Sequence, residues 1–453
     1  MLRKVLVANR GEIACRVIRA CRGLGIATVA VYSEADADAP HVSMADESVL
    51  IGPPRSQQSY LNTKKILEAA HACGADSIHP GYGFLSENDT FAEAVMKAGL
   101  VWIGPDPESI RKMGDKQSAR LLAIQAGVPV APGSRRLDET DVEDIETEAA
   151  KIGYPLLIKA SAGGGGIGMR QVFEPNQLKA AFETTQSQAR AAFGCGDVFL
   201  EKLVARARHV EVQIFGFGST AVHVRERDCS TQRRFQKVIE EAPAPNISDP
   251  VRRHLQEAAV ALSTAVGYQG AGTVEFILDV DTEAFYFLEM NTRIQVEHPV
   301  TEMISGLDLV AMQLQHAGGE LKSIRQEDIV ARGHALECRV YAENPAKHFM
   351  PSPGKLLELT LPAQDAGTVR VETGYTEGSE ISIYYDPMIA KIITHGTDRG
   401  EAIDRMIVAL GHTRISGVRT NIEFLTRCLN HPDFRAGRIT TSFIADHQKD
   451  LCG

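Results

Sequence analysis

The 453-residue sequence lacks the features that mark several large classes of protein. No apolar run approaches the roughly 18–20 residues that a membrane-spanning helix requires. The few apolar residues near the start are followed at once by Arg10 and Glu12, so neither a signal peptide nor a membrane partner is expected. The glycines follow no G-X-Y period. The composition, with 44% hydrophobic and 23% charged residues, excludes collagen-like, coiled-coil and disordered chains. The length suggests about three domains, and we expect a cytoplasmic globular protein.

An excess of basic charge is also missing. The chain carries 48 Lys and Arg against 58 Asp and Glu, a formal net charge of −10 at pH 7, which argues against a nucleic-acid-binding protein. Its eight cysteines are scattered and include no C-x-x-C pair. Such cysteines are typically free thiols in a reducing compartment, so we expect neither a zinc site nor a disulfide.

The first 110 residues or so alternate short apolar strands with amphipathic helices. Strands are expected at 4–8, 27–32, 77–80 and 101–104. This alternation predicts a doubly wound parallel sheet. A nicotinamide-binding fold is the obvious rival, but Asn9-Arg10-Gly11-Glu12 follows the first strand where G-x-G-x-x-G would be required.

The rest of the chain predicts two further regions. Residues 127–134 hold two prolines and two glycines and form a candidate hinge. Beyond the hinge we expect helices and strands in this order: a helix at about 141–152, a strand at 156–159, a helix at about 175–193, mostly strands from 198 to 300, and a helix at about 302–317. From about 330 the pattern is β-rich, and then helical near 398–411 and 421–429.

Four consecutive glycines, residues 163–166, follow the strand at 156–159. Their unhindered backbone N–H groups can wrap a phosphate, and Lys159 adds a positive charge beside them. The Walker pattern is not met, because Met169-Arg170 stands where Lys-Ser/Thr would be needed. The segment therefore predicts a phosphate-binding flap of another kind, with a plain flexible turn as the alternative.

Two carboxylates are predicted to face each other in a hairpin. The stretch from 273 to 291 is typical of two strands joined by a turn near Asp281-Thr282, and a turn centred on Thr282 places Glu275 opposite Glu289. Asn291 then lies on the same face, because side chains alternate along a strand. Facing carboxylates repel each other, whereas oxygen ligands of this kind suit Mg²⁺ or Mn²⁺. We expect a metal site, with a solvated acidic pair as the alternative.

Three polar residues, Arg293, Gln295 and Glu297, continue at alternate positions. A cation, an amide and a carboxylate beside a metal–nucleotide site predict an anion pocket with a built-in base. The segment 225–238 carries five cations and predicts an anion-facing loop, although a solvated charge run is the usual reading of such a stretch. In the strand predicted near 209–216, His209 falls on the polar face, where alone it is weak support for a site.

In these motifs the chain resembles the biotin carboxylase family, the ATP-grasp component of biotin-dependent carboxylases. The matching stretches follow the family order along nearly the whole chain: ANRGEIA (8–14), HPGYGFLSEN (79–88), MGDK (113–116), KASAGGGG (159–166), ERDCSTQRR (226–234), QKVIEEAPAP (236–245), GAGTVEF (270–276), EMNTRIQVEHPVTEM (289–303), HALECRVYAE (334–343), PSPGK (351–355) and YYDPMIAK (384–391).

The resemblance implies an α/β protein of three domains. These are a doubly wound N-terminal domain at 1–114, an ATP-grasp domain at 115–328 with a mobile glycine-rich lid at 135–202, and a β-rich C-terminal domain at 329–453. It also implies residues that line an ATP site, namely Lys116, Lys159, Gly165, Gly166, Glu201, Lys202, Leu203, Val204 and His209.

The remaining roles implied by the resemblance concern the metal and the acceptors. Glu275, Glu289 and Asn291 would hold Mg²⁺ or Mn²⁺, in agreement with the hairpin prediction. Bicarbonate would contact Lys237, Arg293, Gln295 and Val296. Glu297 is implied as the base that deprotonates bicarbonate, and Arg339 as the residue that steadies the biotin enolate.

The resemblance further implies that ATP and bicarbonate form carboxyphosphate, from which biotin is carboxylated. The chain has no Ala-Met-Lys-Met biotinylation sequence, so biotin is expected on a separate biotin carboxyl carrier protein. Carboxyltransferase subunits would then use the carboxylated biotin, as in an acetyl-CoA carboxylase of fatty acid biosynthesis. A homodimer is implied as well.

Two positions depart from the family pattern. Ile167 follows the four glycines where the family usually has Lys or Arg, and Phe235 stands where the family often has a polar residue that touches the ribose. Both departures predict weaker nucleotide binding. Two alternatives stay open: another ATP-grasp ligase that activates bicarbonate or a carboxylate, and a nucleotide-sensing paralogue with weakened activity.

Overall fold

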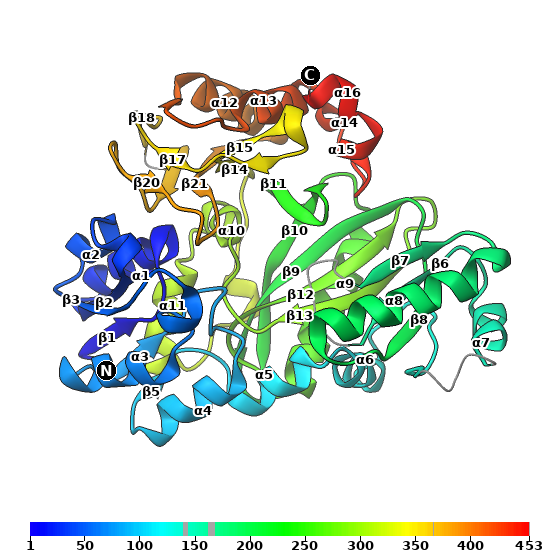
Figure 1. Cartoon of the computed structure of the whole chain (residues 1–453), viewed down its shortest axis with the longest axis horizontal. Coiled ribbons are helices and arrows are strands. Elements are labelled where there is room, and N and C mark those ends of the chain that lie inside the picture. Colours follow the sequence, from blue (N-terminus) through cyan, green and yellow to red (C-terminus); the bar gives the residue numbers. More distant parts are fainter. Residues whose placement is uncertain (139–143, 162–167, 366, 453) are drawn as a thin grey trace.

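The computed structural model describes residues 1–138, 144–161, 168–365 and 367–452. Gly165, Gly166 and Ile167, for which the sequence predicts a phosphate-binding flap, therefore lie outside the described residues. Within the described ranges, no helix combines the length and the apolar character needed to cross a membrane. Figure 1 shows the N-terminal region in blue at the left, the C-terminal region in orange and red at the top, and the segment from α7 to β8 at the right.

The N-terminal region is a five-stranded parallel sheet with the strand order β3-β2-β1-β4-β5, which confirms the predicted doubly wound arrangement. Its strands are β1 (Lys4–Val7), β2 (Ala27–Ser33), β3 (Glu47–Gly52), β4 (Ser77–His79) and β5 (Val101–Trp102). Its helices are α1 (Gly11–Gly23), α2 (Pro40–Met44), α3 (Thr63–Ala72), α4 (Asp89–Lys97) and α5 (Pro107–Gly114). The side chains of Asn62, Asn88 and Asp106 accept backbone N–H bonds at the starts of α3, α4 and α5.

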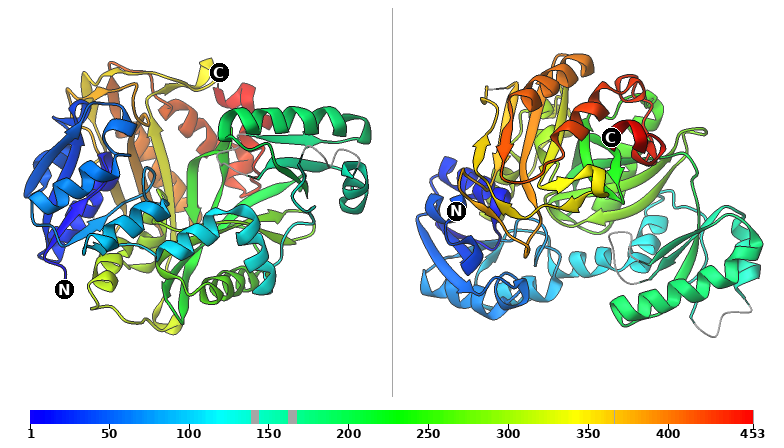
Figure 2. Two further views of the ribbon diagram at one scale, coloured as in Figure 1. Left: turned by 60° about the horizontal axis from the view of Figure 1, so that its bottom comes forward. Right: turned by 45° about the horizontal axis from the view of Figure 1, so that its top comes forward.

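Residues 135–202, here called the small domain, contain a small sheet of their own. The helix α6 (Lys116–Gln125) precedes this domain in the chain. Three antiparallel strands lie in the order β7-β6-β8: β6 (Leu156–Ala160), β7 (Met169–Val172) and β8 (Val198–Lys202). The helices α7 (Ile145–Ile152) and α8 (Leu178–Phe193) flank it, and a separate apolar core includes Ile158, Phe182 and Leu200. Both views in Figure 2 show this domain standing to one side of the rest. The helix expected from 141 begins at Ile145, and 141–143 lie outside the described residues.

An eight-stranded sheet forms the body of the molecule, in the order β13-β12-β9-β10-β11-β14-β21-β19. Its strands are β9 (Ala207–Phe217), β10 (Ala221–Arg233), β11 (Gln236–Ala242), β12 (Gln269–Asp279), β13 (Phe285–Asn291), β14 (His334–Tyr341), β19 (Val369–Thr373) and β21 (Met388–Gly396). All neighbours are antiparallel. Because β11 pairs with β14, the sheet runs across the domain boundary expected near residue 328.

Several predicted elements need correction. A helix, α9 (Asp249–Ala265), occupies part of the segment that the sequence predicted to be mostly strands. The single helix expected at 302–317 is two helices, α10 (His298–Ser305) and α11 (Leu309–Ala317). Gly306 ends α10 with a φ of +72°, a left-handed conformation that favours glycine, and Asp308 caps α11.

The C-terminal helices agree with the sequence. They are α12 (Arg399–His412) and α13 (Ile422–Asn430), followed by the short helices α14 (Pro432–Arg435), α15 (Phe443–Asp446) and α16 (Gln448–Cys452). Short strands complete this region as the pairs β15 (Glu343–Asn344) with β16 (Met350–Pro351), β17 (Gly354–Lys355) with β20 (Glu380–Ile381), and β18 (Glu358–Thr360) with β22 (Arg414–Ser416).

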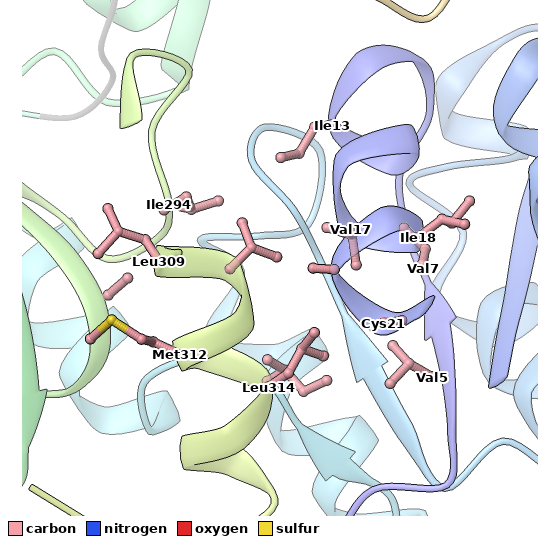
Figure 3. Close-up of a cluster of buried hydrophobic side chains, with 14 of the residues drawn as sticks. Val5, Val7, Ile13, Val17, Ile18, Cys21, Ile294, Leu309, Met312 and Leu314 are labelled. Carbon is pink, nitrogen blue, oxygen red and sulfur yellow. The ribbon is translucent and has the colours of Figure 1, made fainter. Parts of the chain in front are cut away.

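An apolar core joins the N-terminal region to the body. Ile13 and Val17 of α1 belong to the same buried cluster as Leu309 and Leu314 of α11 (Figure 3). Ile294, from the segment that follows β13, is fully buried in this cluster. The buried Ile294 side chain anchors that segment in the core, whereas the polar side chains of its neighbours Arg293 and Gln295 face away from the core.

Candidate active site

The predicted hairpin register is confirmed at the site. Glu275 on β12 lies opposite Glu289 on β13, and Thr273 lies opposite Asn291. A bulge after Glu275 shifts the register toward the turn, but it does not disturb the facing carboxylates. The Asn291 side-chain amide donates to Glu275 Oε1 over 2.9 Å, so all three predicted ligands lie together.

A row of charged residues continues across the sheet from this pair. Glu275 lies opposite Glu211 on β9, and Glu211 lies opposite Arg227 on β10. Directly opposite residues of antiparallel strands project from the same face, so four strands present the row on one face. Lys237 on β11 reaches into it, with its Nζ 2.6 Å from Glu211 Oε2 and 2.9 Å from Glu275 Oε1.

Glu297 lies between two cations at the end of this row. Lys237 Nζ is 2.7 Å from its Oε1, and the Arg339 guanidinium is 3.0 Å from its Oε2. Burial would raise the pKa of Glu297, but Lys237 and Arg339 outweigh burial and lower that pKa below its ordinary value. Glu297 is therefore ionised throughout the physiological range. We call Lys237, Glu275, Glu289, Glu297 and Arg339 the site floor.

The two facing carboxylates have opposite electrostatic environments. Burial would raise the pKa of Glu275, yet Lys237 and His209, whose Nε2 is 2.8 Å from Glu275 Oε2, lower it well below the ordinary value. For Glu289, burial and the charge of Glu275 together raise the pKa. A divalent cation between the two would relieve that repulsion, and the carboxylate and amide oxygens are the hard ligands that Mg²⁺ prefers. The residues present therefore fit the predicted metal.

The segment 225–238 is a hairpin and not the loop that the sequence predicted. It spans the end of β10 and the start of β11, joined by a two-residue turn at Arg234 and Phe235. Arg227 is fully buried and donates to Glu211, Gln213, Thr273, Gln295 and Thr301. Arg233 pairs with Glu343. These cations neutralise the protein's own carboxylates, a pairing that a charge run in a sequence does not reveal.

The residues after β13 are held by the floor and by the N-terminal region. Gln295 donates to Glu275 Oε1 over 2.7 Å and accepts from Arg227 over 2.7 Å, which fixes the orientation of its amide. Arg293 donates to Glu87 over 3.0 Å and to Asn291 Oδ1 over 2.9 Å. Glu87 belongs to the 79–88 segment of the N-terminal region, one of the stretches that carry the family resemblance.

Most of the expected ATP residues lie in or beside the small domain. Lys159 on β6 forms an ion pair with Glu201 on β8. Lys202 donates to the backbone carbonyls of Tyr154 and Gly153 over 2.8 and 3.2 Å, so its amine is used within the domain. Leu203 and Val204 follow β8 and are half-buried. Lys116 begins α6, where burial lowers its pKa. His209 contacts Glu275 of the floor, and the negative charge of Glu289 in the floor acts on Lys116.

Sequence reasoning gave no role to three charged residues that surround the floor. Glu211 lies on β9, Glu240 on β11 and Lys391 on β21. A signal existed for Lys391, since it is the one charged residue in the apolar run from Met388 to Thr394. A lone charge in such a run indicates a buried ion pair.

Comparisons with known proteins agree with this architecture. Three family profiles match in order: "Biotin carboxylase, N-terminal domain" at 1–110, "Carbamoyl-phosphate synthase L chain, ATP binding domain" at 115–324, and "Biotin carboxylase C-terminal domain" at 337–446. Biotin carboxylase 1 of Bacillus subtilis is 50% identical over 446 residues, which cover 98% of each chain. Methylcrotonoyl-CoA carboxylase subunit alpha of Rattus norvegicus is 51% identical over 449 residues, but the chain spans only 62% of that protein's length.

Solved structures are equally similar. The biotin carboxylase domain dimer of Hydrogenobacter thermophilus 2-oxoglutarate carboxylase, in complex with MgADP, ADP and bicarbonate, has a TM-score of 0.94 and 45% identity over 100% of this chain and 99% of that one. Campylobacter jejuni biotin carboxylase in a complex described as β-γ-ATP has a TM-score of 0.94 and 44% identity, covering 99% of each chain.

The fold, the facing carboxylates and the matched ATP-binding domain define an ATP-grasp protein. Its ATP-binding domain lies between two domains specific to one family, which sets it apart from a carbamoyl-phosphate synthetase half. The chain belongs to the biotin carboxylase family. The predicted resemblance and fold class are thus confirmed.

Proposed function

We propose that this chain is an ATP-dependent biotin carboxylase, which activates bicarbonate with ATP and carboxylates biotin on a separate carrier protein. The observation that carries the proposal is Glu297, an ionised carboxylate held between Lys237 and Arg339 beside the Glu275–Glu289 pair. A base, two cations and an acidic pair within one row are the groups that activation of a small anion by a nucleotide requires.

Bicarbonate would bind where Lys237, Arg293, Gln295 and the backbone at Val296 converge. Lys237 now neutralises three carboxylates, so a bound anion would draw part of its charge away from Glu297. The pKa of Glu297 would rise as a result, and Glu297 would become a better acceptor for the bicarbonate proton. Deprotonated bicarbonate is the stronger nucleophile toward the γ-phosphate.

Glu275, Glu289 and Asn291 would hold the metal that accompanies ATP. Mg²⁺ or Mn²⁺ bound there would offset the charge that builds on the phosphate oxygens during transfer. The chain's own contribution is to position the reactants: Gln295, which accepts a hydrogen bond from Arg227, donates to the Glu275 carboxylate and holds it in place. Lys116, Lys159, Gly165, Gly166, Glu201, Lys202, Leu203, Val204 and His209 are proposed to line the nucleotide site, and closure of the small domain would exclude water from carboxyphosphate.

Arg339 would act in the second step. Its guanidinium is 2.5 Å from Glu240 Oε1 and 3.0 Å from Glu297 Oε2, so both carboxylates orient it. In this position it would stabilise the negative charge that develops on the ureido oxygen when biotin loses its N–H proton. The proton would pass to the phosphate released from carboxyphosphate, and the biotin nitrogen would attack CO₂.

The partners follow from this chemistry. A biotin carboxyl carrier protein would deliver biotin, and carboxyltransferase subunits would move the carboxyl group to a final acceptor such as acetyl-CoA. The solved relative from Hydrogenobacter thermophilus is a domain dimer, and we propose a homodimer here. A cytoplasmic location is part of the proposal, because eight free thiols are typical of a reducing compartment.

The test is ATP hydrolysis by the purified chain, measured with and without bicarbonate and with and without free biotin. We expect hydrolysis that depends on bicarbonate and increases with biotin, together with formation of carboxybiotin from labelled bicarbonate. Hydrolysis that depends on bicarbonate but leaves biotin unlabelled would indicate another ATP-grasp ligase. Nucleotide binding without turnover would indicate a nucleotide-sensing paralogue.

A further inference from the structure

We infer that Lys391, which no step above uses, is a positioning residue that fixes the backbone of the base Glu297; this inference rests on the proposed function. Lys391 lies on β21 and its side chain is 0% exposed. Its Nζ donates to the carbonyl oxygen of Val296 over 2.6 Å. That carbonyl belongs to the peptide that joins Val296 to Glu297, so Lys391 determines how this peptide is oriented.

The carbonyls on either side of this peptide have donors of their own: the Gln295 carbonyl accepts from His298, and the Glu297 carbonyl accepts from the Val300 N–H. Residues 292–297 connect β13 to α10 and belong to neither a strand nor a helix. On one side, Ile294 anchors the segment in the apolar core shared with α1. On the other side, closer to the base, the Val296 carbonyl has Lys391 as its donor. Without that donor the peptide could rotate, and the Glu297 carboxylate would move with it.

Lys391 and Arg339 act as a matched pair across two strands. They lie directly opposite each other on β21 and β14, so both side chains project from the same face. Arg339 contacts the carboxylate of Glu297 over 3.0 Å, and Lys391 contacts the backbone immediately before it over 2.6 Å. One cation thus holds the reactive group of the base and the other holds its main chain.

The ammonium of Lys391 is balanced by the N-terminal region. Glu12, in the first turn of α1, places its Oε1 3.1 Å from Lys391 Nζ. Tyr82, from the 79–88 segment, donates its hydroxyl to the same Glu12 oxygen. Lys391 therefore connects three parts of the chain, α1, the 79–88 segment and β21, to the Val296–Glu297 peptide. Figure 1 shows α1, α10 and β21 lying close together.

The experiment compares the intact wild-type chain with Lys391→Met, which has a similar shape but no charge or donor. We expect the KM for bicarbonate in biotin-independent ATP hydrolysis to rise about tenfold to a hundredfold, the worth of one charge-assisted hydrogen bond. The affinity for MgADP should stay within about twofold of wild type by the same reasoning, because no nucleotide contact changes. Lys391→Arg keeps a cationic donor and should recover most of the loss.

Glu12→Gln is the second variant, for the case in which Lys391→Met does not fold. It leaves Lys391 bonded to Val296 but removes the balancing charge, and we expect a rise of a few-fold in the same KM. Lys355→Met, an exposed lysine on β17, is the matched control and should behave as wild type.

A lower melting temperature with an unchanged bicarbonate KM in both site variants would show a merely structural role and overturn the inference. Equal loss of bicarbonate and MgADP affinity would also overturn it. If the wild-type chain itself showed no bicarbonate-dependent hydrolysis, the proposed function would fail, and the inference would fall with it.

Discussion

The site floor and the small domain neutralise their charges in different ways. In the floor, Lys237 is shared among Glu211, Glu275 and Glu297, which come from two strands and the segment after β13. In the small domain, Lys159 pairs with Glu201 on the neighbouring strand, and Lys202 bonds to backbone carbonyls of the same domain. Charges in the floor are thus positioned by the whole fold, whereas those of the small domain are positioned locally.

This difference predicts how substitutions in each region should affect catalysis and nucleotide binding. A substitution in the floor leaves other buried charges without a partner, so it should impair the chemical steps themselves. A substitution in the small domain removes one local contact and should mainly weaken nucleotide binding. The two regions can therefore be separated by measuring kcat and KM in the same set of variants.

The largest effect is expected for Glu289→Gln. The substitution removes one of two facing carboxylates and with it much of the affinity for the metal. Loss of about 4 kcal/mol of transition-state stabilisation corresponds to roughly a thousandfold lower turnover. The measurement is ATP hydrolysis at ordinary and at high Mg²⁺, with thermal unfolding to show that the fold is retained. Near-normal turnover at ordinary Mg²⁺ would mean that the pair does not hold the metal.

Arg339→Ala should separate the two half-reactions. Enolate stabilisation is needed only when biotin is carboxylated, so carboxybiotin formation should fall at least about a hundredfold. Biotin-independent ATP hydrolysis should survive in part, although Glu297 loses one of its two cations. Arg339→Lys, which keeps the charge without the planar fork, is the matched variant. An equal loss of both activities would place Arg339 in the phosphate chemistry instead.

The next prediction concerns the stability of the fold and its dependence on pH. Glu241 is a buried residue of β11, next to the floor's Glu240, and it bonds to His334 and Arg399. Burial would raise its pKa, but Arg399 and His334 lower it from 4.5 to about 2. A depressed carboxyl pKa stabilises the fold above the ordinary pKa, and this stabilisation is lost as the pH falls from 4.5 to about 2. A shift of this size corresponds to about 3 kcal/mol. Glu241→Gln should melt lower at pH 7 and lose less stability than wild type on acidification below pH 5; parallel curves would contradict the prediction.

Lys159→Met should have a smaller effect and a different signature. Its loss removes one cation from the proposed phosphate site, which should raise the KM for ATP about tenfold to a hundredfold and change kcat little. Lys151→Met, in the exposed Lys151–Glu148 pair of the same domain, is the matched control and should leave the KM unchanged. A fall in kcat of the size expected for Glu289→Gln would show that the small domain takes part in the chemistry as directly as the floor.

Residue patterns predicted the local parts of the site, whereas its distant parts, Lys237 and Arg339, were expected only from the family resemblance. The facing of Glu275 and Glu289 follows from one hairpin, whose register depends on a short turn and the two-residue period of strands. The contacts of Lys237 and Arg339 with Glu297 join residues 60 and 42 positions apart, and no local period encodes them. The run of charges around Arg227 suggested a loop because strands whose charges are paired internally look like solvated segments in a sequence.

The sequence interpretation missed the helix α9 and the break between α10 and α11, although the sequence contains features that indicate both. Leu255, Ala259 and Leu262 recur at helical spacing in α9, in a segment where strand patterns on both sides dominated the interpretation. Gly306 and Asp308 mark the end of α10 and the start of α11, but apolar residues continue on both sides of them. Helix ends of this kind depend on a single glycine and a single cap, and periodicity alone passes over them.

The smallest effect concerns the exposed tip of the hairpin that carries Lys237. Arg234 and Phe235 have φ angles of +47° and +66°, a left-handed conformation that costs a non-glycine residue free energy, and Phe235 is 65% exposed. Phe235→Gly removes that cost at one position while adding entropy to the unfolded chain, so we expect a gain of up to about 1 kcal/mol in stability.

The matched control is Phe173→Gly in the small domain. Phe173 is 56% exposed and is absent from the residues with positive φ, so the same loss of an exposed ring should destabilise the chain slightly. Opposite shifts of the melting temperature in the two variants would tie the effect to the turn of the hairpin that carries Lys237.

The KM for ATP tests whether Phe235, which stands where the family often has a polar residue, affects nucleotide binding. Because the Phe235 ring is largely exposed, Phe235→Gly should change that KM by less than about twofold. A larger rise would mean that the ring packs against the nucleotide, and that the hairpin that carries Lys237, like the small domain, contributes to nucleotide binding.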